Sequence, residues 1–199
     1  NEQPDIWCER VFAPWVDMEE EMRKHDIPLF ALESGDSVAE FDFIGFTLQY
    51  ELSYTNILNM LNLAGIPISA QDRTDLFHIV VAGGPCACNP EPLADFVDLF
   101  FIGEGEQVDL EVIRLYQACK KEGKSKEEFL QKAAQIQGVY VPSLYSVTYH
   151  DDGTIKEMIP HAAAPKTVRK RLELDMDKAY FPEKFVVPSI EIVHDRAVA

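Results

Sequence analysis

Two glycine-rich loops, each placed directly after a short β-branched or aromatic run, constrain the fold of this chain most. The runs are His78–Ala82 and Asp98–Ile102, and the loops are Gly83-Gly84-Pro85 and Gly103-Glu104-Gly105-Glu106. Apolar runs of this length are typical of strands buried on both faces of a sheet. Both loops are therefore predicted to follow the carboxyl ends of strands, where open α/β sheets bind ligands.

Strands and helices are predicted to alternate over the first part of the chain. Further strands are predicted at Trp7–Phe12 and Phe41–Thr47. The predicted helices are an acidic one after Pro14 with Trp15, Met18 and Met22 on one face, Tyr54–Ala64 ended by Gly65, and Val108–Cys119. This alternation, with helix-length crossovers, predicts a doubly wound, flavodoxin-like (Rossmann-like) α/β fold with a parallel sheet. We expect the strands near 42–47, 78–82 and 98–102 to lie side by side.

From Val139 the pattern predicts a small β-rich extension. Val139–Tyr149 and Thr154–Ile159 flank Asp152-Gly153, a dipeptide that strongly favours a hairpin turn. Beyond the hairpin, a charged stretch with several prolines ends in the apolar run Ile190–Val193. The predicted organisation is an α/β domain over residues 1–137, a hairpin over 138–164 and a linker over 165–199 that leads into another domain.

Charge and cysteine content narrow the classes of function. The formal net charge is −16, from 18 Lys and Arg against 34 Asp and Glu, which argues against nucleic-acid binding. The four cysteines have no disulfide spacing, and no apolar run approaches the length of a membrane span. We therefore expect a reduced, cytoplasmic protein without membrane contact. Cys86-x-Cys88 has the wrong spacing for a zinc site, so we expect no metal ligands here.

The glycine loops match no nucleotide-binding motif. Neither fits G-x-G-x-x-G, and the chain has no phosphate loop. Glu104 and Glu106 place negative charge where a phosphate would bind, so a bulky, mostly neutral ligand with amide groups suits this edge better. Tight packing between strand and helix is the alternative explanation of such glycines. The predicted cofactor-binding residues are Thr47, Leu48, Gln49, Tyr50, Gly83, Gly84, Pro85, Gly103, Glu104 and Gly105.

Several sequence blocks in the same order resemble one family. The blocks are 9–15 (ERVFAPW), 45–51 (GFTLQYE), 82–85 (AGGP), 89–95 (NPEPLAD) and 103–106 (GEGE), with the tail 188–196 (PSIEIVHDR). They resemble the cobalamin (B12)-binding-type radical S-adenosylmethionine (radical SAM) proteins, catalogued as uncharacterised Fe-S oxidoreductases. The resemblance implies the N-terminal, cobalamin-binding-like domain of an enzyme whose core carries a [4Fe-4S] cluster. Such a core cleaves S-adenosylmethionine reductively to start radical chemistry.

The chain also departs from that family. It contains neither the C-x-x-x-C-x-x-C cluster motif nor the D-x-H-x-x-G motif whose His ligates cobalt. The resemblance therefore implies a fragment without catalysis of its own, whose partner is its radical SAM core and whose cobalamin would bind without a protein His ligand. The alternative is an interaction module that docks on the core, or recognises an RNA or protein substrate, without binding cobalamin.

The resemblance further implies that the first βα unit of the sheet is missing. Its loss would leave unpaired strand edges beside Phe41–Thr47 and Val11–Phe12. Such edges can pair with another chain. We therefore expect either a homodimer or a rearranged second strand.

Overall fold

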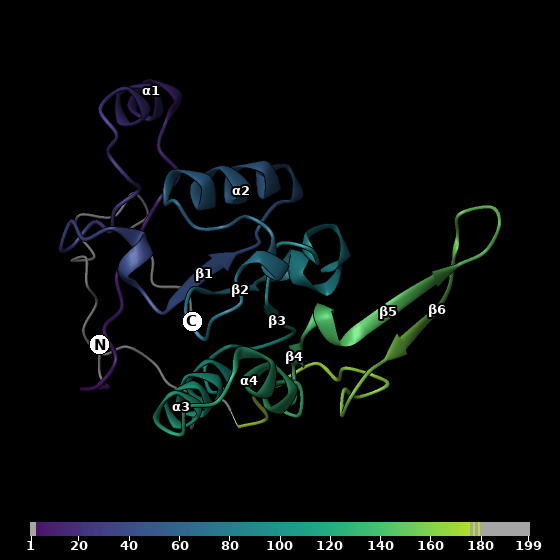
Figure 1. The fold of residues 1–199 in the computed structure, drawn as a ribbon. Helices are drawn as coiled ribbons and strands as arrows, with labels where there is room; N and C mark the ends of the chain where they lie inside the picture. The colour runs from purple at the N-terminus through teal and green to yellow at the C-terminus, as the bar shows by residue number, and fades with distance from the viewer. Residues whose placement is uncertain (1–2, 176, 178, 180–199) are drawn as a thin grey trace.

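The computed structural model describes residues 3–175, 177 and 179 and contains a four-stranded sheet with helices on both faces (Figure 1). Its strands lie in chain order and are β1 (Phe43–Thr47), β2 (Ile79–Gly83), β3 (Leu99–Phe101) and β4 (Val139–Tyr140). β1, β2 and β3 are parallel, and β4 is antiparallel to β3. The predicted α/β class, and the predicted neighbourhood of the three parallel strands, are confirmed.

The α-helices of the described residues are α1 (Val16–Lys24), α2 (Tyr54–Leu63), α3 (Val108–Lys121) and α4 (Lys126–Ala133). Three of them cover the two faces of the sheet, and α1 lies beyond α2, to which Arg23 donates hydrogen bonds (Figure 1). α2 lies over one face, and α3 and α4 lie over the other (Figure 1). Gly65 takes a φ of 69° two residues after the end of α2, as expected of a helix C-terminal stop.

The position of β2 between two helical layers explains why its sequence is apolar without a break. Val80 and Ala82 belong to the core under α2, whereas Ile79 and Val81 belong to the core under α3 and α4. All four are buried, because successive side chains of a strand point to opposite faces. A strand between two helical layers has no position that faces solvent, so none of its residues needs to be polar.

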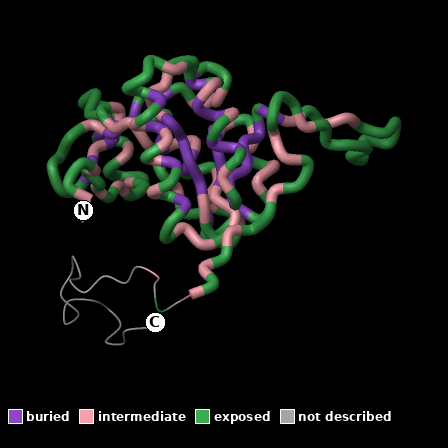
Figure 2. Tube along the Cα trace, turned by 90° about the horizontal axis from the view of Figure 1, so that it is seen from below, coloured by how far each residue is buried: buried purple, intermediate pink, exposed green. Residues whose placement is uncertain are grey.

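The hairpin extends away from the body of the domain. Its strands, β5 (Tyr145–Tyr149) and β6 (Ile155–Pro160), form a separate two-stranded sheet whose residues are largely exposed (Figures 1 and 2). The predicted single strand Val139–Tyr149 is thus wrong in one respect. It divides at Pro142, which has no N–H to donate to a ladder, so that Val139 and Tyr140 join the main sheet.

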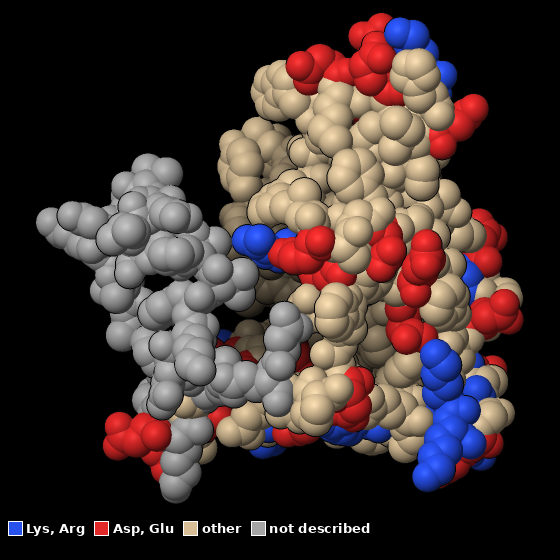
Figure 3. Space-filling view, turned by 90° about the vertical axis from the view of Figure 1, so that its left-hand side faces the viewer, with Lys and Arg blue, Asp and Glu red and all other residues tan. Residues whose placement is uncertain are grey.

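The predicted strand at Trp7–Phe12 is wrong, whereas the predicted helix after Pro14 is confirmed as α1. Residues 7–12 form no strand, because Arg10 bonds instead to the following loop, accepting from the Leu32 N–H at 2.9 Å and donating to the Glu33 carboxylate at 2.8 Å. On α1, Met22 is buried, but Trp15 and Met18 are 78% and 45% exposed. The predicted apolar face therefore contacts the core at Met22 alone of these three. Figure 3 shows acidic side chains gathered on α1.

β1 lies at one edge of the sheet. Across from it, residues 9–12 and β1 line a cavity of about 390 Å³. Among the described residues no further strand pairs with β1. Pairing of this edge with a second copy of the chain stays a prediction, which light scattering at several protein concentrations would test.

Candidate functional site

The predicted glycine loops lie at the same edge of the sheet. Thr47 is the register partner of Gly83 at the carboxyl ends of β1 and β2. The Leu48 N–H donates to the Gly83 carbonyl at 2.6 Å, and the Cys86 N–H donates to the Leu48 carbonyl at 3.0 Å. Gly103 follows β3, the next strand, by two residues. The structure thus brings together the segments that the sequence singled out.

Close packing explains why residue 84 is glycine. Gly84 has a φ of 100°, and a Cβ there would lie 3.1 Å from both the N and the O of Leu48. Any other residue would therefore be strained at this φ, and its Cβ would be crowded by the backbone of Leu48, which directly follows β1. At this position the packing explanation accounts for the glycine without a ligand.

The second glycine loop is covered by a later segment of the chain. The Arg171 N–H donates to the Ile102 carbonyl at 2.8 Å, and the Glu104 N–H donates to the Arg171 carbonyl at 3.2 Å. The Glu173 N–H donates to the Glu104 carboxylate. The amide and carboxylate of Glu104, a predicted cofactor-binding residue, are therefore already engaged within the chain.

Replacing Gly103 by alanine should detach this covering segment. Gly103 has a φ of 118°, and a Cβ there would lie 2.1 Å from the Arg171 carbonyl oxygen. We expect Gly103→Ala to lower the free energy of unfolding by about 1–3 kcal/mol. We also expect it to abolish hydrogen-exchange protection of the Arg171 amide. Gly123→Ala is the matched control, since Gly123 has a φ of 66° with nothing within 4 Å of its Cβ position. Equal loss of Arg171 protection in both variants would contradict the assignment.

The remaining predicted residues divide between surface and core. Thr47 and Gln49 are exposed and Tyr50 is 58% exposed, whereas Leu48 is fully buried. Leu52, two residues beyond Tyr50, is 76% exposed. Gln49 and Tyr50 can therefore contact a partner or ligand, and Leu48 holds their loop to the sheet.

The cysteines do not offer a cluster site. Cys119 is a buried residue of α3, and Cys86 and Cys88 are two residues apart in a short 3-10 turn. Burial and the neighbouring Glu51 carboxylate raise the pKa of the Cys86 thiol, which disfavours the thiolate that a metal would need. Among the described residues no group of three or more His, Cys, Asp or Glu side chains is placed to hold a metal ion. These residues do not fit a [4Fe-4S] cluster.

A buried charged triad at the opposite end of the sheet was not predicted from the sequence. The Asp98 carboxylate, just before β3, accepts from the Arg73 guanidinium at 3.1 Å and from the Lys126 ammonium at 2.7 Å. These side chains are 2%, 1% and 7% exposed, respectively. Burial lowers the pKa of Lys126, and Asp98 opposes that shift. A signal was present in the sequence, since Asp98 begins an otherwise apolar run.

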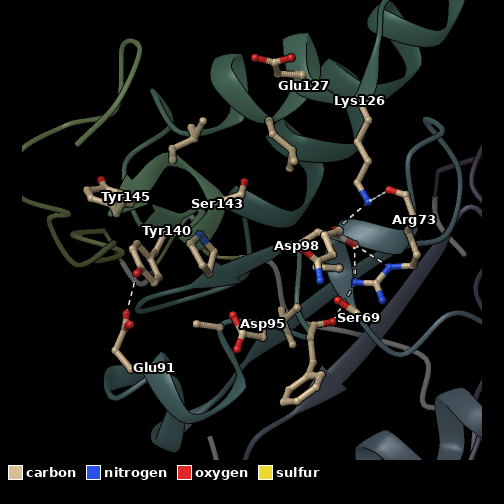
Figure 4. A pocket seen from close by; sticks show the side chains of 18 of the residues that line it. Ser69, Arg73, Glu91, Asp95, Asp98, Lys126, Glu127, Tyr140, Ser143 and Tyr145 are labelled. Atoms are coloured by element: carbon tan, nitrogen blue, oxygen red, sulfur yellow. Dashed lines mark hydrogen bonds and ion pairs between the residues drawn. The ribbon is translucent and has the colours of Figure 1, made fainter. Parts of the chain in front are cut away.

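This triad borders a cavity of about 960 Å³ (Figure 4). The cavity lies between the body of the domain and the hairpin, and its walls include Asp95, Tyr140 and Tyr145. Neither this cavity nor the one beside β1 is lined by a predicted cofactor-binding residue. Both of these cavities are therefore separate from the glycine loops.

Comparison with known proteins assigns the chain to a family. Residues 1–142 match the family described as the N-terminal region of radical SAM proteins, and the chain belongs to that family. An uncharacterised protein of Methanocaldococcus jannaschii is 37% identical over 94 residues, which are 46% of this chain and 20% of that protein. The match thus spans a fifth of the relative's length. No solved structure matches the chain. No helix in the described part is long and apolar enough to cross a bilayer.

Proposed function

We propose that this chain supports the catalytic core of a radical SAM protein, and that the core docks at the carboxyl edge of β1 and β2. The docking surface consists of Thr47–Leu52 and Gly83–Pro85. The core, not this chain, supplies the [4Fe-4S] cluster and binds S-adenosylmethionine. Membership in the family of radical SAM N-terminal regions supports the association with such a core.

The observation that carries this proposal is exposed apolar surface on a rigid support. Tyr50 and Leu52 are 58% and 76% exposed. Their loop is held to the sheet by the contacts of Leu48 with Gly83 and Cys86. Large exposed apolar side chains on a loop whose backbone is anchored are suited to binding another protein surface, because little backbone freedom is lost on contact.

Hydrogen exchange in the full-length protein tests the docking surface. We expect the amides of residues 47–52 and 83–85 to be protected, and we expect Tyr50→Ala with Leu52→Ala to remove much of that protection. Trp15→Ala is the control, because Trp15 is 78% exposed on a different element. Fast exchange of these amides in the unmutated protein, or equal effects of both variants, would rule out docking at this edge.

Cobalamin binding at the same edge is the second candidate. Gln49 offers an exposed amide and Tyr50 an exposed flat ring at the strand ends, where α/β sheets bind ligands. A corrinoid would bind here without a protein His ligand, because the chain has no D-x-H-x-x-G motif.

A visible absorption spectrum separates the two candidates. The full-length protein would be purified anaerobically from cells supplied with cobalamin. Corrinoid bands that disappear in Tyr50→Ala would support the second candidate. A protein without corrinoid bands, but with protected residues 47–52, would support docking alone.

A further inference from the structure

The 960 Å³ cavity lies beside the amino end of β3, at the opposite end of the sheet from the docking surface. Its volume is within the range of about 300–1,000 Å³ that is usual for small-ligand sites. Figure 4 shows Tyr140 and Tyr145 toward one side of it and the triad of Arg73, Asp98 and Lys126 toward the other.

Tyrosine rings form the wall on the hairpin side. Tyr145, Val147 and Tyr149 alternate along β5, so that their side chains share the face of the strand that lines the cavity. The Tyr140 ring lies 5.2 Å from the Tyr145 ring, centre to centre. Aromatic faces attract cations such as guanidinium and ammonium groups.

The cavity carries uncompensated negative charge. Its lining includes four carboxylates, Glu91, Asp95, Asp98 and Glu127, but two cations, Arg73 and Lys126. Both cations are paired with Asp98, which leaves the other three carboxylates without an ion-pair partner in the described structure.

Arg73 cannot turn to neutralise these carboxylates. Its guanidinium donates to Asp98 and to the backbone carbonyls of Pro67, Ile68 and Phe96. These bonds use all five of its N–H groups. Arg73 is therefore not free to neutralise these carboxylates, so a cationic ligand would be favoured in this cavity.

Glu91 and Asp95 are suited to contact that cation. The Tyr140 hydroxyl donates to Glu91 at 2.5 Å and fixes its carboxylate. The Asp95 carboxylate has no hydrogen-bond partner among the described residues.

Lys126 indicates a second requirement of the ligand. Its ammonium group has three N–H donors, of which one bonds the Arg73 carbonyl at 2.6 Å and another bonds Asp98. The third N–H has no acceptor among the described residues, although the Lys126 side chain is only 7% exposed and lines the cavity. A buried donor without an acceptor is costly, so a ligand carbonyl would be favoured there.

We propose that this cavity binds a basic residue in peptide form, an arginine or lysine whose cationic group contacts Glu91, Asp95 and the tyrosine rings. A peptide carbonyl of the same ligand accepts from Lys126. Phosphates and nucleotides are poor ligands for this cavity, because its three unpaired carboxylates would repel them.

Three small probes test the proposal on the ¹⁵N-labelled chain by two-dimensional NMR in 150 mM salt. The first is Nα-acetyl-arginine methylamide. The second is its citrulline counterpart, which replaces the guanidinium by a neutral urea group. The third is agmatine, which keeps the guanidinium but has no amide. We expect saturable shifts at residues 69–74, 91–98 and 145–149 with the arginine probe, and at least about tenfold weaker binding of the other two.

Variants separate this site from general attraction to an acidic protein. Glu91→Gln with Asp95→Asn should weaken binding of the arginine probe by about tenfold while the spectrum stays that of a folded protein. Glu20→Gln, an exposed carboxylate on α1, should leave the affinity within twofold. Absence of saturable shifts, equal weakening by the control, or equal affinity for the citrulline probe would overturn the proposal. Equal affinity for agmatine would overturn the requirement for a peptide.

Discussion

Replacing Asp98 by alanine is expected to lower the free energy of unfolding by about 3–5 kcal/mol. The substitution leaves the Arg73 and Lys126 cations buried without their counter-charge. It also removes the acceptor of the Val80 N–H, which donates to the Asp98 carboxylate at 2.8 Å. Urea unfolding followed by circular dichroism measures the loss. A chain that is unfolded without urea would agree with the largest values.

Asp95→Ala is the matched control for this prediction. Asp95 is an exposed carboxylate three residues earlier on the same segment, and its replacement should change the free energy of unfolding by less than about 0.5 kcal/mol. Asp98→Asn keeps an acceptor for the Val80 N–H and should fall between the two. A loss of less than 1 kcal/mol in Asp98→Ala would show that the triad is dispensable.

Replacing Phe129 by alanine is expected to have an effect of similar size, about 3–5 kcal/mol. Phe129 is fully buried, and its ring lies edge-on to Tyr116 at 5.7 Å and to Phe43 at 6.5 Å between centres. The change therefore opens a cavity where α3, α4 and β1 meet. The same urea measurement applies.

Phe12→Ala removes the same side chain from the surface. Phe12 is 64% exposed, so its loss should cost less than about 1 kcal/mol. A similar decrease in the free energy of unfolding in both variants would mean that Phe129 is not important to the core under α3 and α4.

Burial on both faces explains which strands the sequence could predict. Ile79–Ala82 reads as a strand because every position of it is buried. Residues 7–12 also have a strand-like composition, but a strand needs a neighbour, and their hydrogen bonds go to the loop at 32–34 instead. β4 was merged with β5 because two residues are too few to show a period of their own.

Contacts between residues that are far apart in the sequence could not be predicted from local sequence patterns. Asp98 and Lys126 are separated by a whole helix, and Arg171 meets Gly103 after the chain has passed through α3, α4 and the hairpin. The glycine loops predicted the edge correctly, because each loop directly follows a short apolar run, which is a local pattern. That another part of the same chain covers the Gly103 loop could not be predicted from spacing.

The contact of Arg171 with the loop after β3 makes that loop an anchor for the segment around Arg171. Two backbone hydrogen bonds, and the ion pair of Arg171 with Glu111 at 2.5 Å, fix the chain there. The backbone of Arg171 is thus positioned by the sheet, although Arg171 lies far along the chain from β3. A larger residue at position 103 would therefore displace Arg171 as well as the loop itself.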